Sequence, residues 1–234
     1  THTTHTTHTT QQRTAATKKV KNNSSPEKYS KIHKNTQKYT KMTDFEFYKE
    51  SLVTACNEIK EKKKTKALKD VIGKEFEEHR KRVWEHFGFT VSKDRGLALW
   101  DVDWNIKNSK GETIAIEEDK AHYLDSCFLE RALAGFAKTV NSYLKNNQEV
   151  PCIILHSFTS YSKYEVKLNE FCEILRDDIA HLMREKIVYI TLCERDRLPT
   201  KKWFQNCDYA YIDNVHDDFI NRDISFIKSF TAHH

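Results

Sequence analysis

The sequence predicts an α/β fold in which helices flank a central mixed β-sheet, and three observations lead to this prediction. Apolar residues recur every three or four positions in several segments, which is typical of amphipathic helices. Two nearly continuous apolar runs, 150–157 and 187–193, are typical of strands that are covered on both faces. Between the helical segments, residues 99–106 alternate apolar and polar side chains as a half-buried strand does. We therefore expect a single folded domain over residues 44–234.

A basic and polar tail precedes this domain. Residues 1–43 contain nine Lys or Arg residues and one acidic residue, Glu27, so the tail carries a net charge of +8, whereas the whole chain carries +5. The tail opens with the repeat THTTHTTHTT and contains very few apolar residues. We expect it to be disordered, with no metal role for its histidines. A basic disordered arm can add salt-dependent attraction to a polyanion.

Composition argues against several classes of protein. No apolar run is long enough to span a membrane, and no signal peptide is visible, so we expect an intracellular protein of the cytoplasm or nucleus. The six cysteines lack metal-ligand spacing and are expected to be reduced thiols rather than zinc ligands. The chain has only five glycines and no phosphate-binding loop or serine nucleophile elbow, which disfavours NTPases, dinucleotide-binding enzymes and α/β-hydrolases.

Helix signals are found on both sides of the central stretch. Thr43 or Asp44 can cap a first helix, and a second over about 67–87 should end at Gly88. Asp125 or Ser126 can cap the helix that follows the central stretch. Further helices are predicted over 163–185 and 215–230, and short strands over 89–91 and 209–212.

The centre of the predicted sheet is a pair of strands that carries several charged residues. The strand over 99–106 is followed by a turn at 108–111 and by a second strand that starts at 113–116. This second strand runs directly into the acidic and basic side chains of residues 117–120. If the two strands pair, their charged residues meet at one end of the hairpin.

Alternation along the strands places certain charges on the same side. Asp101 and Asp103 share one side of the first strand, and Glu118 and Lys120 share one side of the second. Two acidic oxygen ligands suit a hard cation such as Mg²⁺. A Lys beside such an ion can position water or stabilise negative charge on a phosphate.

An Asp followed by Glu-x-Lys at the end of an apolar strand resembles the PD-(D/E)XK nuclease superfamily, which has the restriction-endonuclease-like fold. The match is Asp103, Glu118 and Lys120. No Pro precedes the first Asp, so Asp101 remains an alternative to Asp103. The predicted order of elements over 67–212 also resembles that nuclease core. The resemblance implies a restriction-endonuclease-like core and Mg²⁺ as cofactor, with Mn²⁺ as a substitute.

The resemblance also implies a role for each matched residue. Asp103 and Glu118 would hold the ion, and Lys120 would act beside it in catalysis. Many members of the superfamily place a further Glu on the first core helix, for which Glu75 and Glu78 are the candidates. Basic residues after the central hairpin and in later loops are candidates for DNA contact. These are Arg131, Lys163, Arg195, Arg197 and Lys201.

These expectations describe a Mg²⁺-dependent DNA endonuclease. Sequence-specific, restriction-type cleavage of duplex DNA by a symmetric homodimer is the first expectation. A DNA repair nuclease or a junction resolvase is the alternative within the same class. A non-catalytic nucleic-acid-binding protein, whose acidic residues coincide with the motif by chance, is the alternative from another class.

Overall fold

The structure is a computed structural model, and it describes residues 42–94, 96–98, 102–121, 126–194 and 215–231. The chain divides into two units, Thr1–Lys41 and Met42–His234, and every described helix and strand belongs to the second. Residues 1–41 of the basic tail and the strand expected over 209–212 lie outside the described residues.

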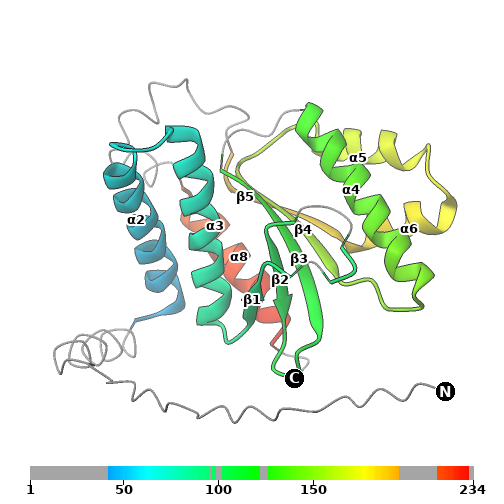
Figure 1. Cartoon of the computed structure of the whole chain (residues 1–234), viewed down its shortest axis with the longest axis horizontal. Coiled ribbons are helices and arrows are strands. Elements are labelled where there is room, and N and C mark those ends of the chain that lie inside the picture. The colour runs from blue at the N-terminus through cyan, green and yellow to red at the C-terminus, as the bar shows by residue number, and fades with distance from the viewer. Residues whose placement is uncertain (1–41, 95, 99–101, 122–125, 195–214, 232–234) are drawn as a thin grey trace, which may run out of the picture. The chain divides into compact units, whose positions relative to one another are not determined.

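The described strands form one five-stranded sheet in the order β1-β2-β3-β4-β5 (Figure 1). The strands are β1 Thr90–Ser92, β2 Trp104–Lys107, β3 Thr113–Lys120, β4 Cys152–Thr159 and β5 Ile187–Cys193. β1, β2 and β3 pair antiparallel, whereas β3, β4 and β5 pair parallel. The predicted α/β class with a mixed sheet flanked by helices is thus confirmed.

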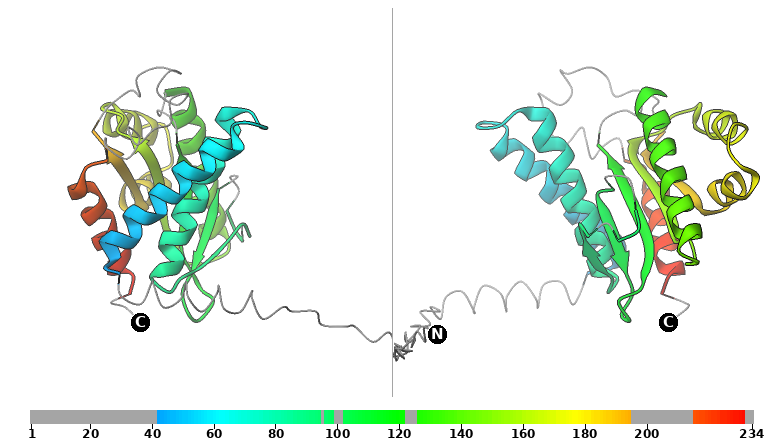
Figure 2. Two further views of the ribbon diagram at one scale, coloured as in Figure 1. Left: turned by 90° about the vertical axis from the view of Figure 1, so that its left-hand side faces the viewer. Right: turned by 45° about the vertical axis from the view of Figure 1, so that its right-hand side comes forward.

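Helices cover both faces of the sheet (Figures 1 and 2). One apolar core lies between the sheet and α2 Asp44–Lys62, α3 Leu68–His86 and α8 Asp217–Ser229. The other core lies between the sheet and α4 Ser126–Lys145, α5 Tyr164–Cys172 and α6 Asp177–Lys186. Because a crossover between parallel strands places a helix on the sheet face, β4 sends apolar side chains into both cores, Ile154 into the first and Ile153 and Leu155 into the second.

Local sequence explains where the first elements begin and end. Thr43 caps α2 through a reciprocal pair of hydrogen bonds with Glu46, the capping box that Thr at this position favours. The backbone at Gly88 has φ +89°, a conformation that glycine adopts without strain, and α3 ends just before it. The hairpin between β2 and β3 turns at Gly111, whose N–H donates to the carbonyl of Asn108 at 3.0 Å.

The prediction of one continuous helix over 163–185 is wrong. The structure has two helices there, α5 and α6, separated by residues 173–176. Arg176 has extended backbone and binds the side chain of Asp178 at 2.6 Å, so the helix restarts there. The break allows the apolar side chains of Leu175 and Ile179 to pack against the second core. Helical spacing alone does not reveal such a change of direction.

The strand predicted over 99–106 begins later than expected. β2 starts at Trp104, while Val102 and Asp103 lie before it in irregular backbone, and residues 99–101 are outside the described part. Asp103 is therefore not held by strand alternation and is free to turn toward β3. No described helix is sufficiently long and apolar to cross a bilayer.

Candidate metal centre at the ends of β2 and β3

The candidate site lies where β3 and β4 end and β2 begins. The carboxyl ends of parallel strands meet at the same edge of a sheet, and ligand sites concentrate there. In the register of β3 and β4, Asp119 lies beside His156, and Lys120 lies beside Ser157. Four residues of β3, Glu117 to Lys120, thus bring three carboxylates and one ammonium group to this edge.

Alternation along β3 sends these side chains to opposite faces of the sheet. Glu117 contacts Arg80 and Trp84 of α3, so Glu117 and Asp119 face α3. Glu118 and Lys120 face α4 together with Ile116, which belongs to the core on that side.

The Nζ atom of Lys120 lies 4.3 Å from the ring centroid of Phe128, a residue of α4. This cation–π contact holds the ammonium group on the α4 side of β3.

Asp103 joins the α3 side of this edge. Its Oδ2 atom accepts a hydrogen bond from the backbone N–H of Asp119 at 2.8 Å. Burial raises the pKa of Asp103 to about 7, and the carboxylate of Glu77 adds to this effect, while the hydrogen bond from Asp119 opposes it. A carboxyl group with this pKa is half protonated near neutral pH. A neighbouring cation would favour the ionised carboxylate and lower this pKa.

Two charged side chains, Glu77 and Lys93, shift the pKa of Asp103 in opposite directions. Lys93 donates a hydrogen bond to Glu77 at 2.9 Å, and its ammonium group lies 4.8 Å from the ring centroid of Trp104. Glu77 raises the pKa of Asp103, whereas Lys93 lowers it. Lys93 is therefore a cation close to Asp103 on the α3 side, where Lys120 is not.

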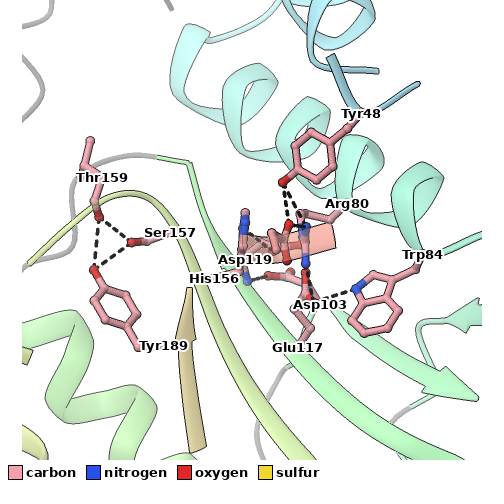
Figure 3. Close-up of polar contacts among 11 residues, drawn as sticks. Tyr48, Arg80, Trp84, Asp103, Glu117, Asp119, His156, Ser157, Thr159 and Tyr189 are labelled. Carbon is pink, nitrogen blue, oxygen red and sulfur yellow. Dashed lines mark hydrogen bonds and ion pairs between the residues drawn. The ribbon is translucent and has the colours of Figure 1, made fainter. Parts of the chain in front are cut away.

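Next to Asp103 lies a group of buried side chains that we call the Arg80 cluster, made of Arg80, Glu117, Tyr48 and Trp84, labelled in Figure 3, together with Asp223. Nε and Nη2 of Arg80 bind the two oxygens of Glu117 at 2.7 and 3.1 Å, and Nη1 binds Asp223 and Tyr48. Trp84 donates to Glu117 at 2.8 Å, and Tyr48 donates to Asp223 at 2.6 Å. The cluster joins α2, α3, β3 and α8.

Next to the Arg80 cluster, Asp119 and His156 form what we call the Asp119–His156 pair. Both side chains are fully buried, and Nδ1 of His156 lies 3.4 Å from Oδ1 of Asp119. Among the described residues, no hydrogen-bond partner meets either Asp119 oxygen or either ring nitrogen of His156. Burial is the main cause that raises the pKa of Asp119 and lowers that of His156, and the carboxylate of Glu117 raises the former further.

Glu117, Asp119 and His156 satisfy the geometric condition for a shared cation. One possible ligand atom from each lies within 4.8 Å of the other two, and all three residues are buried. Two carboxylates and an imidazole form a donor set that binds divalent cations in proteins. The unpartnered oxygens and nitrogens of the Asp119–His156 pair fit such an ion.

The structure places the predicted site residues as follows. Asp103 approaches β3 at Asp119, while Glu118 and Lys120 lie on the other face of that strand. Glu78 is half-buried on α3 and contributes to the electrostatic field at Lys93. Glu75 is buried and accepts a hydrogen bond from Lys62 at 2.7 Å, so it serves the contact between α2 and α3.

The predicted DNA-contacting residues are only partly described. Arg131 is exposed, and its Nε atom donates to the carbonyl of Cys127 at 3.4 Å. Lys163 is exposed at the start of α5. Asp101, Arg195, Arg197 and Lys201 lie outside the described residues.

Sequence reasoning did not single out Glu77, the Asp119 side chain or His156 as site residues. Asp119 is the middle residue of the Glu-x-Lys run, and only its backbone carbonyl was considered as a possible further ligand. A usable signal for His156 existed, because an ionisable residue within a continuous apolar strand must be either paired or ligated when buried. Glu77 carried no such signal, since Glu is common on helix surfaces.

Comparison with known proteins adds no identification. No family model, no curated protein and no solved structure matches this chain.

Proposed function

We propose that this chain is a metal-dependent nuclease with a restriction-endonuclease-like core, which hydrolyses phosphodiester bonds of DNA. The observation that carries the proposal is the hydrogen bond that joins Asp103 to the backbone of Asp119, at the end of a strand that also presents Glu118 and Lys120. The strand order supports it, because three antiparallel strands are followed by a helix and a parallel strand. This is the order of elements expected for that core.

The acidic groups at this edge support a divalent cation as cofactor. Asp103 and Asp119 both have a raised pKa, and each contributes to the crowding of negative charge there. A cation would supply polarisation of the scissile phosphate and a lower pKa for a bound water. Asp103 would hold it from the β2 side, with Asp119 or Glu118 as the partner on β3. The shared α3 face favours Asp119.

The chain's own cations then have distinct tasks. Lys93 lies near Asp103 on the α3 side and would stabilise negative charge on a phosphate that binds there. Lys120 lies on the α4 side against Phe128 and would need to leave that ring in order to reach the same phosphate. Arg131 and Lys163, both exposed, would bind the DNA backbone farther from the site.

Sequence-specific cleavage of duplex DNA by a homodimer is the form of this activity that we propose first. A repair nuclease or a junction resolvase would use the same site on a substrate of different shape. The same fold without cleavage would be a nucleic-acid-binding protein.

The test is a cleavage assay of the purified chain on plasmid DNA and on single-stranded DNA, with Mg²⁺, with Mn²⁺ and with EDTA. Asp103→Asn is expected to lower the rate by about 100-fold or more, because it removes a charge from the metal site. Glu112→Gln, an exposed change at the hairpin turn, is the matched control and should retain the rate. Comparison of Asp119→Asn with Glu118→Gln identifies the β3 ligand, because only the true ligand lowers the rate.

The outcome also separates the forms of the function. Discrete metal-dependent fragments would support a restriction-type enzyme, and a smear or branched-DNA preference would support a repair nuclease or resolvase. DNA binding without cleavage under any metal condition would overturn the nuclease proposal in favour of a binding protein.

A further inference from the structure

The Asp119–His156 pair is the least satisfied buried group in the described part of the chain. Four side-chain atoms, both oxygens of Asp119 and both ring nitrogens of His156, lack a hydrogen-bond partner there. A buried polar group without a partner costs about 1–3 kcal/mol in stability, so such groups are rarely left together without a reason. Their side chains lie against each other and next to Glu117 (Figure 3).

We infer that Glu117, Asp119 and His156 bind a first-row transition metal, and that His156 is the residue that makes this metal preferred over Mg²⁺. The inference rests on the proposed function, because it concerns the ion that Asp119 would hold at this edge of the sheet. It goes further than that function, since the superfamily resemblance implies Mg²⁺ and two acidic ligands without an imidazole. The donor set of the site decides between these ions.

Ligand chemistry gives the reason. Mg²⁺ prefers oxygen ligands and keeps several of its waters, and it is therefore poorly served by an imidazole in a closed site. Divalent transition metals such as Mn²⁺, Fe²⁺ and Co²⁺ accept one imidazole together with carboxylates. The three ligand atoms lie within 4.8 Å of one another, so a single ion can reach all of them.

The surroundings keep His156 in the form that a metal needs. Phe76 stacks on its ring with a centroid distance of 5.0 Å and an interplanar angle of 24°, which fixes the ring plane. A ligating imidazole must be neutral, and both burial and the nearby Arg80 favour the neutral ring.

Glu117 is fixed from the opposite side. Arg80 binds both of its oxygens and Trp84 binds one, so its carboxylate cannot rotate away from Asp119. Partners that orient a ligand in this way are a regular part of metal sites and typically contribute about 10- to 100-fold to metal affinity. The Arg80 cluster would thus act as the support of the metal site.

The test uses Mn²⁺ as a paramagnetic probe of the full chain and detects nitrogen ligation directly. Electron spin echo modulation of bound Mn²⁺ is expected to contain the coupling of one imidazole nitrogen. All samples carry His2→Asn, His5→Asn, His8→Asn and His33→Asn, so that the tail histidines do not contribute. His156→Asn is expected to abolish the coupling and to weaken Mn²⁺ binding by about 10- to 100-fold.

His79→Asn is the matched control. His79 is as buried as His156 and lies near the same Phe76 ring, but it bonds Ser51 at 2.9 Å and is not among the three clustered ligands. The variant should retain the nitrogen coupling. Mg²⁺ binding, titrated separately, should change by less than about twofold in His156→Asn, because Mg²⁺ does not use the imidazole.

The outcomes separate this inference from the nuclease proposal. Bound Mn²⁺ without nitrogen coupling, or coupling that survives in His156→Asn, would overturn the inference even if the chain cleaves DNA with Mg²⁺. Coupling that depends on His156 in a chain that cleaves no DNA would support the inference and overturn the nuclease. If His156→Asn does not fold, the chain with the tail-histidine substitutions and an intact His156, labelled with ¹⁵N-histidine, serves instead, and an unchanged modulation pattern would overturn the inference.

Discussion

The Arg80 cluster and the Asp119–His156 pair lie side by side between α3 and β3, yet they are satisfied to different degrees. In the cluster, every guanidinium nitrogen of Arg80 and both oxygens of Glu117 have partners at hydrogen-bond distance. In the pair, four polar atoms have none among the described residues. Both groups are fully buried, so exposure to water does not explain the difference.

The difference separates the part of the polar core that supports the fold from the part that we propose binds a metal ion. Burial of charge is tolerated in the cluster because Arg80 meets two carboxylates and each carboxylate meets at least two donors, although Oδ1 of Asp223 has no partner among the described residues. The pair pays an uncompensated desolvation cost in the metal-free protein. Groups that reduce stability in this way are typical of binding and catalytic sites.

The largest effect is expected when the cluster loses its central cation. Arg80→Met would leave Glu117 and Asp223 buried without their counter-ion, and should lower the free energy of unfolding by about 3–5 kcal/mol in urea denaturation. Lys81→Met, at the next position of α3, is the control. The Lys81 side chain is partly exposed, and its single ion pair in the described residues, with Glu85, is long at 3.8 Å. It should change stability by no more than about 0.5 kcal/mol. Equal losses in the two variants would contradict the role of Arg80.

A smaller loss is expected when the cluster loses one donor. Tyr48→Phe removes the hydroxyl that donates to Asp223 at 2.6 Å, while Arg80 still binds that carboxylate. The expected loss is about 1.5–3 kcal/mol, the range for hydrogen bonds to charged groups. Tyr143→Phe is the control, since the Tyr143 hydroxyl makes no hydrogen bond to a described residue. A Tyr48→Phe variant as stable as this control would show that the hydroxyl is dispensable.

The raised pKa of Asp103 is expected to make the stability of the metal-free protein depend on pH. The pKa of Asp103 is about 7 in the folded chain, above the value of about 3.9 in unfolded chains. The folded state therefore holds a proton that the unfolded state has lost between about pH 4 and pH 7, so this contribution to stability falls as the pH rises through that window. The Asp103→Asn variant has no ionisable group at this position, so its free energy of unfolding should not show this decrease.

The measurement is the free energy of unfolding of wild type and Asp103→Asn in metal-free buffer at several pH values. The difference should grow in favour of the variant from pH 4 to 7, by at most about 1.4 kcal/mol per pH unit, and then stay constant. Saturating Mn²⁺ should remove the difference in slope, because the cation replaces the proton. A constant difference at all pH values would contradict the raised pKa.

The smallest effect is expected at the pair itself, and its sign is reversed. Asp119→Asn removes a buried carboxyl whose oxygens meet no hydrogen-bond donor among the described residues, and should stabilise the metal-free protein by about 1 kcal/mol above pH 7. The same variant should lose the increase in melting temperature that Mn²⁺ produces in the wild type. Calorimetry with and without Mn²⁺ checks both. A destabilised Asp119→Asn would mean that the carboxylate has a structural partner.

Much of the site's position could be predicted from the chain, but its composition could not. Asp103 and residues 117–120 were expected to meet, and Asp103 does approach β3. The partner expected there was Glu118, two residues before Lys120, whereas the hydrogen bond is made to Asp119. Asp103 lies outside β2, so strand alternation does not set the direction of its side chain.

The sequence by itself determined the elements whose signals are local. Capping by Thr43, the stop at Gly88 and the turn at Gly111 depend on backbone conformations that neighbouring residues set. The alternation of Glu117 with Glu118 along β3 follows from the period of two in any strand.

Only the tertiary structure decided which helix covers each face of β3, and which distant residues complete the site. Alternation says that Asp119 and Glu118 face opposite ways, but the choice of face depends on how α3 and α4 pack on the sheet. His156 reaches Asp119 through the parallel register of β3 and β4, which is set by the burial of both strands. Burial and register are properties of the whole packed chain, and they convert an ordinary run of charges into a candidate metal site.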